Sequence, residues 1–121
     1  PKFIKRKKYI YNQYVEGINK IEGLRIAKVP SHASNNHWMT VMQINKKKYG
    51  LGRKKIIKLL KNKNIESRPV WGLNHLQKPY KKFQNFKIEK ALKLLEESLC
   101  LPSSSNQSED ETRKIIKILN G

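Results

Sequence analysis

Residues 98–121 read SLCLPSSSNQSEDETRKIIKILNG and contain one complete strand–loop–helix signal. The apolar run Leu99–Leu101 predicts a short strand, which ends where a proline and three serines follow. Ser108 and Glu111 have the spacing of a capping box, acidic residues fill the next turn, and a glycine closes the segment. The predicted helix has its core face at Ile115, Ile116 and Leu119.

Three further segments upstream are predicted to be extended. The clearest is HWMTVMQIN, residues 37–45, which alternates large and β-branched side chains. A shorter strand is expected at Ile26–Val29, followed by a loop. Residues 65–71 are expected to be extended because Pro69 disfavours helical geometry at the residue before it.

Apolar periodicity predicts three more helices. The first covers Phe3–Ile21 and ends at Glu22-Gly23, and the second covers Arg53–Lys63 after a polar turn at 46–52. The third runs from Ile88 to Ser98. The inner face of the second helix is expected at Ile56, Ile57, Leu59 and Leu60.

Strands and helices in this order predict a small α/β (α+β) domain, with a short mixed or antiparallel sheet covered on one face by helices. The 121 residues suffice for one domain with a modest core. Residues 1–22 are interpreted as a connecting helix from a large domain outside this chain, because the helix is too basic and aromatic to be stable alone. Residues 23–121 form the predicted small domain.

The net charge of +18 arises from 27 basic and 9 acidic residues. Such a field attracts polyanions, so a stand-alone basic nucleic-acid-binding module is one alternative. Only five of the basic residues are arginines, and lysine lacks the bidentate geometry with which arginine recognises bases and phosphates. A dedicated nucleic-acid function is therefore not favoured.

Several classes of site find no support in the sequence. The three histidines and the single cysteine, Cys100, have no zinc-ligand spacing, and no metal site is predicted. The chain has no phosphate-binding glycine loop and no nucleophile elbow. Cys100 lies in an apolar run and is expected to be a buried hydrophobic residue. No membrane span or signal peptide is visible, so a cytoplasmic location is expected.

Polar and aromatic residues gather at two predicted strand ends. Asn35 to Trp38 lie around the start of the strand predicted at 37–45, and the second group lies around the end of the extended segment at 65–71. The second group comprises Arg68, Trp71, Asn74 and His75. The tryptophans could equally belong to the core, and His75 could be an ordinary loop histidine.

Four short motifs occur in a fixed order: NHW at 36–38, NIESRPVW at 64–71, NHLQKPY at 74–80 and LCLPSS at 99–104. In this order the chain resembles the C-terminal portion of the DegT/DnrJ/StrS family of pyridoxal-phosphate-dependent sugar-nucleotide aminotransferases. The combination of RPVW with NHLQKPY is most similar to members of legionaminic-acid-type amino-sugar pathways. Asn64 and Ser67 depart from the glycine and threonine that are usual in the family.

The resemblance implies a pyridoxal phosphate cofactor, bound mainly by the large domain, and transfer of an amino group from glutamate to a nucleotide-linked ketosugar. It implies that His75 lies nearest the cofactor and that Arg68 binds an anionic group of a substrate. Asn36, His37 and Trp71 are implied as further substrate contacts.

None of the lysines matches the family's Schiff-base lysine, so no catalytic residue is assigned and the chain alone is expected to be inactive. The resemblance also implies a homodimer for the intact enzyme. A degenerate remnant of such an enzyme remains a further alternative.

Overall fold

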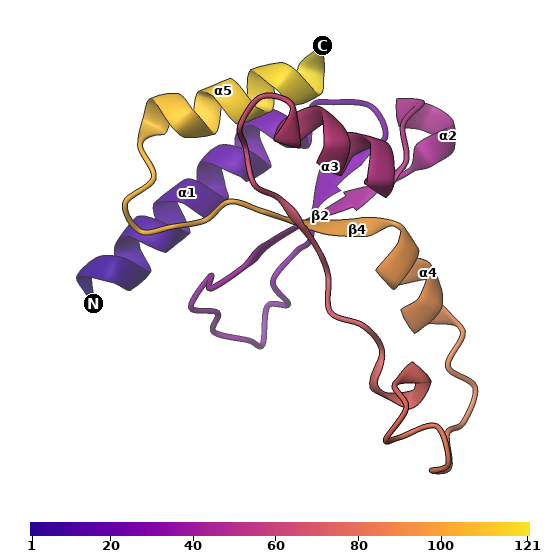
Figure 1. The fold of residues 1–121 in the computed structure, drawn as a ribbon. Coiled ribbons are helices and arrows are strands. Elements are labelled where there is room, and N and C mark those ends of the chain that lie inside the picture. The colour runs from indigo at the N-terminus through magenta and orange to yellow at the C-terminus, as the bar shows by residue number, and fades with distance from the viewer.

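The computed structural model describes all 121 residues, which build one antiparallel sheet with helices packed against it (Figure 1). The helices are α1 (Lys2–Ile18), α2 (Lys46–Tyr49), α3 (Arg53–Lys61), the 3-10 helix η1 (Asn74–Leu76), α4 (Lys90–Glu96) and α5 (Glu109–Asn120). The strands are β1 (Leu24–Ile26), β2 (Thr40–Ile44), β3 (Arg68–Pro69) and β4 (Ser98–Leu101).

The sheet has the order β1-β2-β4-β3, and every neighbouring pair is antiparallel. Thr40 pairs with Leu101 and Met42 with Leu99, so these side chains project from the same face. That face is buried, whereas Val41 and Gln43 on the other face are only half-buried. The predicted small α+β domain with helices over one sheet face is confirmed.

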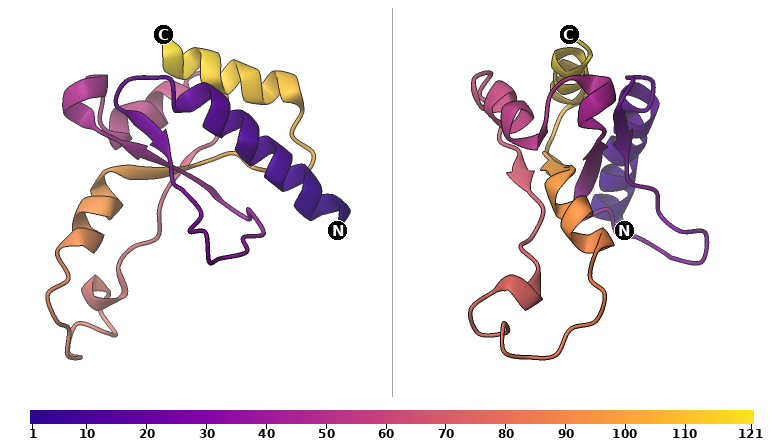
Figure 2. Two further views of the ribbon diagram at one scale, coloured as in Figure 1. Left: turned by 180° about the vertical axis from the view of Figure 1, so that it is seen from behind. Right: turned by 90° about the vertical axis from the view of Figure 1, so that its right-hand side faces the viewer.

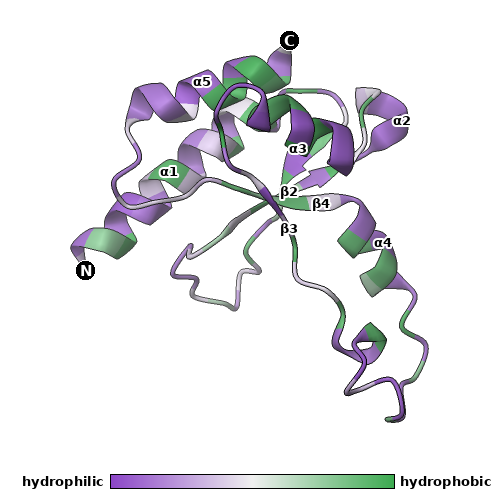
Figure 3. Ribbon diagram, viewed as in Figure 1, coloured by the Kyte–Doolittle hydropathy of each residue, from purple (hydrophilic) through white to green (hydrophobic).

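Three helices supply the apolar side chains that cover this face. α1 and α5 lie side by side in the views of Figures 1 and 2, and α3 completes the layer. Figure 3 shows hydrophobic residues concentrated in the second half of α5, while α2 is hydrophilic. The buried helical residues of the core are Ile10, Tyr14, Ile18, Ile56, Leu60, Ile115 and Leu119.

A buried polar network fixes the loop between β4 and α5 against α1. The Tyr14 hydroxyl donates to the carbonyl of Pro102 at 2.9 Å and accepts from the Gln107 amide at 2.9 Å. The same amide nitrogen donates to the Thr112 hydroxyl at 2.8 Å. These bonds stabilise the loop because buried polar groups without partners are costly.

The capping box is confirmed. The Ser108 hydroxyl accepts from the backbone nitrogen of Glu111 at 3.1 Å, and the Glu111 carboxylate accepts from the backbone nitrogen of Ser108 at 2.7 Å. These bonds lower the pKa of the Glu111 carboxyl. The helix therefore begins where local sequence predicts it.

Several predicted boundaries were wrong. The first strand is Leu24–Ile26 rather than Ile26–Val29, and β2 begins at Thr40 rather than residue 37. The asparagine side chains just before β2 explain the late start, since Asn35 accepts from the backbone nitrogen of His37 at 2.7 Å. His37 also has a φ of 52°, which is not a strand conformation.

The predicted turn at 46–52 begins with a single helical turn, α2, capped by the Asn45 side chain. The first helix ends at Ile18, so Gly23, which was expected to end it, lies instead in the turn that leads to β1. Gly23 has a φ of 83°, and a Cβ there would lie 2.5 Å from the backbone nitrogen of Tyr49. Only glycine fits this close approach.

Residues 70–89 form an arm that projects away from the sheet before the chain returns through α4 (Figures 1 and 2). Apart from η1 the arm has no helix or strand, and four of its aromatic rings are exposed: Trp71, Tyr80, Phe83 and Phe86. The predicted helix at 88–98 is shortened to Lys90–Glu96.

Candidate functional site

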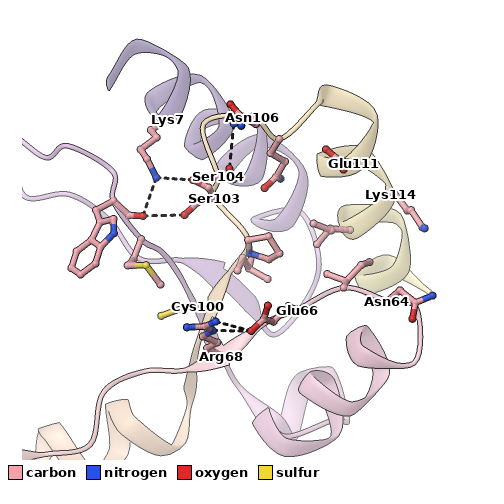
Figure 4. Close-up of a pocket in the computed structure, with 17 residues that line it drawn as sticks. Lys7, Asn64, Glu66, Arg68, Cys100, Ser103, Ser104, Asn106, Glu111 and Lys114 are labelled. Carbon is pink, nitrogen blue, oxygen red and sulfur yellow. Dashed lines mark hydrogen bonds and ion pairs between the residues drawn. The ribbon is translucent and has the colours of Figure 1, made fainter. Parts of the chain in front are cut away.

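A cleft of about 650 Å³ opens where the end of β4, the start of β2, β3 and α5 meet (Figure 4). Its wall includes an aromatic ring from Trp38, the Arg68 side chain and the serines that follow β4. Lys7 enters from α1 and Lys114 from α5. The cleft thus combines an indole with cationic and hydroxyl groups.

Hydrogen bonds hold the backbone of Trp38, whereas no hydrogen bond is made by its ring. Its carbonyl oxygen accepts from the Lys7 ammonium at 3.3 Å and from the Ser103 hydroxyl at 3.1 Å (Figure 4). Its backbone nitrogen donates to the Asn36 side chain at 2.9 Å. The residue is nevertheless 62% exposed. Three chain segments therefore position a ring that the fold does not bury.

Trp71 follows β3 and contacts the Trp38 ring, although Trp71 is not part of the cleft wall. The rings of Trp38 and Trp71 have centroids 5.8 Å apart and planes inclined by 42°. Such a tilted pair is a favourable aromatic geometry. Both residues are 62% exposed, so the contact covers only part of each ring. Of the two predicted strand-end groups, these are the members that the structure brings into contact.

Arg68 lies in β3, paired across the sheet with Cys100. Its guanidinium donates two hydrogen bonds to one carboxylate oxygen of Glu66, at 2.8 and 3.0 Å. The side chains of Arg68 and Glu66 are 72% and 76% exposed, so water screens this pair and it contributes little stability. The guanidinium can exchange this partner for another anion at small cost.

Asn36 and His37 occupy different environments. The Asn36 side chain is exposed and engaged with the backbone of Trp38. His37 is buried, with its ring 4.5 Å from that of Tyr11 by centroids, and its Nδ1 has no hydrogen-bond partner. Burial, assisted by the charge of Lys8, lowers the pKa of His37. In the loop before β2, the His37 side chain is therefore buried, whereas the Asn36 side chain is at the surface.

His75 lies in η1 on the arm and is half-exposed. It is absent from the wall of the cleft. Its assignment as a cofactor contact remains a prediction.

The lysines decide whether this chain could hold pyridoxal phosphate alone. Schiff-base lysines are activated by burial or by a neighbouring cation. No lysine is buried here, and in the cleft Lys7 already donates to the carbonyl oxygens of Trp38 and Ser103. These residues do not fit a complete cofactor site.

Sequence reasoning missed the contributions of Lys7 and Ser103, which fix the Trp38 loop. Lys7 lies in no recognisable motif, whereas Ser103 belongs to the LCLPSS motif, and the two residues are 96 positions apart. The three serines after β4 offered one signal, since hydroxyls directly after a strand commonly bond to neighbouring backbone. No group of three or more histidine, cysteine and carboxylate side chains could hold a metal ion. No helix is both long enough and apolar enough to cross a bilayer.

Comparison with known proteins identifies similar sequences and folds. The profile of the DegT/DnrJ/EryC1/StrS aminotransferase family matches residues 1–120. EpsN of Bacillus subtilis (strain 168), described as a pyridoxal phosphate-dependent aminotransferase, is 27% identical over an alignment of 120 positions that covers 96% of this chain and 30% of EpsN.

Two crystal structures show the same fold. DesI, determined in the presence of its TDP-sugar product, superposes with a TM-score of 0.87 at 22% identity, covering 97% of this chain and 30% of DesI. A DegT DnrJ EryC1 StrS aminotransferase from Brucella abortus superposes with a TM-score of 0.82 at 19% identity, covering 98% and 30%. The chain therefore spans about 30% of the length of each of these relatives.

Proposed function

Because this chain belongs to the DegT/DnrJ/EryC1/StrS aminotransferase family, we propose that it is the C-terminal small domain of a pyridoxal-phosphate-dependent sugar-nucleotide aminotransferase. The intact enzyme moves an amino group from glutamate to a nucleotide-linked ketosugar in the cytoplasm and acts as a homodimer. The motifs at 64–80 favour a substrate of the legionaminic-acid-type amino-sugar pathways. The match over residues 1–120 is the observation that carries the proposal.

Within that enzyme this domain forms one wall of the active site. Arg68 binds an anionic group of a substrate, either the glutamate carboxylate or a phosphate of the nucleotide. Asn36, His37 and Trp71 contact the substrate, and His75 on the arm contacts the cofactor. Pyridoxal phosphate supplies the electron sink of the reaction, and the residues that hold it lie mainly outside this chain.

The absence of a buried lysine supports the view that the 121 residues alone do not transaminate. The purified chain, incubated with pyridoxal phosphate, glutamate and a nucleotide-linked 4-ketosugar, should give no amino sugar by mass spectrometry. The protein at its natural length should give the product. Product formed by the 121-residue chain would refute this part of the proposal.

Substitutions test the assigned residues in the protein at its natural length. Arg68→Ala should lower kcat/KM about 10- to 100-fold, because it removes a charge-assisted hydrogen bond to the substrate. His75→Ala should lower turnover strongly. Arg113→Ala is the matched control for Arg68, since Arg113 is also ion-paired and its side chain is 67% exposed. Unchanged kinetics in Arg68→Ala would remove Arg68 from the site.

A further inference from the structure

Trp38 and Trp71 are the only tryptophans of the chain, and the fold places both rings, largely exposed, in contact with one another. Large aromatic rings bury more apolar area than almost any other side chain. Leaving two of them at the surface forfeits that stabilisation, which indicates that the pair serves a partner or ligand.

The surroundings of the pair favour a ligand that is flat and anionic. Trp38 and Arg68 line the same cleft. Trp71 follows Arg68 by three residues, a distance of at most about 10 Å along an extended chain. An aromatic face next to an arginine is suited to a nucleotide, since bases stack on indoles and guanidinium groups bind phosphates.

From this arrangement we propose that the Trp38–Trp71 pair is the platform for the nucleobase of the nucleotide-sugar substrate and that Arg68 binds its diphosphate. This inference rests on the proposed function and refines it: it assigns the phosphate rather than the glutamate carboxylate to Arg68 and gives Trp38 a role in binding. Trp71 contacts the base.

The geometry prescribes how the base binds. The two indole planes are inclined by 42°, so they form an open notch rather than a parallel slot. A base therefore stacks on one exposed indole face and meets the edge of the other ring. The backbone that carries the Trp38 ring needs little reorganisation, because Lys7, Ser103 and Asn36 already bind it. This pre-organisation reduces the entropic cost of binding.

Charge supports the diphosphate assignment. Glu66 is the only partner of the Arg68 side chain, and their pair is exposed to water. A diphosphate can displace that carboxylate without desolvating a buried ion. The net charge of +18 also raises the local concentration of anionic ligands.

Tryptophan fluorescence tests the platform directly, because every tryptophan signal of the 121-residue chain comes from this pair. We expect UDP, TDP and GDP to quench the emission saturably, since stacking on aromatic rings tolerates any base. Trp38→Ala should weaken UDP binding, measured by calorimetry, about 10-fold or more. Trp38→Phe should retain most of the affinity. Far-UV circular dichroism checks that each variant is folded.

Matched controls separate the platform from general surface effects. Phe83→Ala removes one ring of another tilted pair, Tyr80–Phe83, whose centroids are 6.4 Å apart and which lies on the arm outside the cleft. It should leave UDP affinity unchanged. Arg68→Gln should weaken UDP and inorganic pyrophosphate together, whereas Arg113→Gln should affect neither.

The possible results separate this inference from the proposed function. Three results overturn the platform: no quenching by any of the nucleotides in the chain or in the protein at its natural length, UDP affinity unaffected by Trp38→Ala and Trp71→Ala, or weakening confined to UDP-sugars and absent for UDP. If the protein at its natural length still aminates a ketosugar, the proposed function stands without the platform. UDP binding that depends on Trp38, without any amination, supports the platform and removes the proposed function.

Discussion

Gly17 of α1 packs directly against the Ile116 side chain of α5, and replacing Gly17 by alanine has two opposing effects on stability. An added Cβ would lie 2.7 Å from Cδ1 and 2.8 Å from Cγ2 of Ile116. Alanine favours the helix over glycine by about 0.5–1 kcal/mol. Overpacking typically costs about 1–3 kcal/mol.

The steric effect should dominate, because Ile116 cannot move away cheaply. The end of a flexible side chain could rotate clear, but Cγ2 is attached to a β-branched carbon whose χ1 has one strongly preferred rotamer in a helix. We therefore expect Gly17→Ala to lower the free energy of unfolding by about 1–2 kcal/mol. In an Ile116→Ala background the clash disappears, and Gly17→Ala should be stabilising by up to about 1 kcal/mol.

Urea unfolding followed by circular dichroism measures the four free energies of this double-mutant cycle. The coupling energy should be at least about 1.5 kcal/mol. Ile118→Ala is the control, since Ile118 is a half-buried residue of the same helix that does not contact the added Cβ, and its effect should be additive with Gly17→Ala. A stabilising Gly17→Ala in the wild-type background, or additivity with Ile116→Ala, would refute the close packing of α1 on α5.

Three further predictions concern stability. Tyr14→Phe should cost about 1–3 kcal/mol in urea unfolding, because it removes the donor to the part-buried Pro102 carbonyl, and a neutral result would show that water replaces the hydroxyl. Ser108→Ala should cost about 1 kcal/mol, seen as a lower Tm, since it removes the helix cap, whereas Ser108→Gly should cost less. Burial lowers the pKa of His37 in the folded chain below its ordinary value of 6.5, so the unfolded chain binds a proton more readily and stability should fall as pH drops from 7 to 5. His37→Gln should flatten that dependence, and an unchanged slope would assign it to other groups.

The sequence predicted many of the residues of the candidate site, but it did not predict how they are arranged in space. The motifs identified Arg68 and Trp71, and the loop before β2 was noticed for its asparagines and Trp38. Nothing local indicated that Trp38 and Trp71 make contact, because they are 33 positions apart and belong to segments that meet only through the sheet order. The inward position of His37 was equally invisible, since it depends on Tyr11 from α1.

The amino-acid sequence by itself determined the features that depend on a few neighbouring residues. The capping box of α5, the apolar face of α3 at Ile56 and Leu60, and the end of β4 before Pro102 follow from local hydrogen bonding and side-chain periodicity. The order of the four family motifs identified the domain, although each motif alone is a weak signal.

Only the tertiary structure decided which strands are neighbours and which side chains share the cleft. β3 and β4 pair although the whole arm lies between them, so their contact depends on long-range pairing rather than on any local preference. The same long-range packing shifted β1 by two residues at its start, turned His37 inward and left the indole rings of Trp38 and Trp71 exposed. Such choices minimise the free energy of the whole chain, and short segments of sequence do not contain that information.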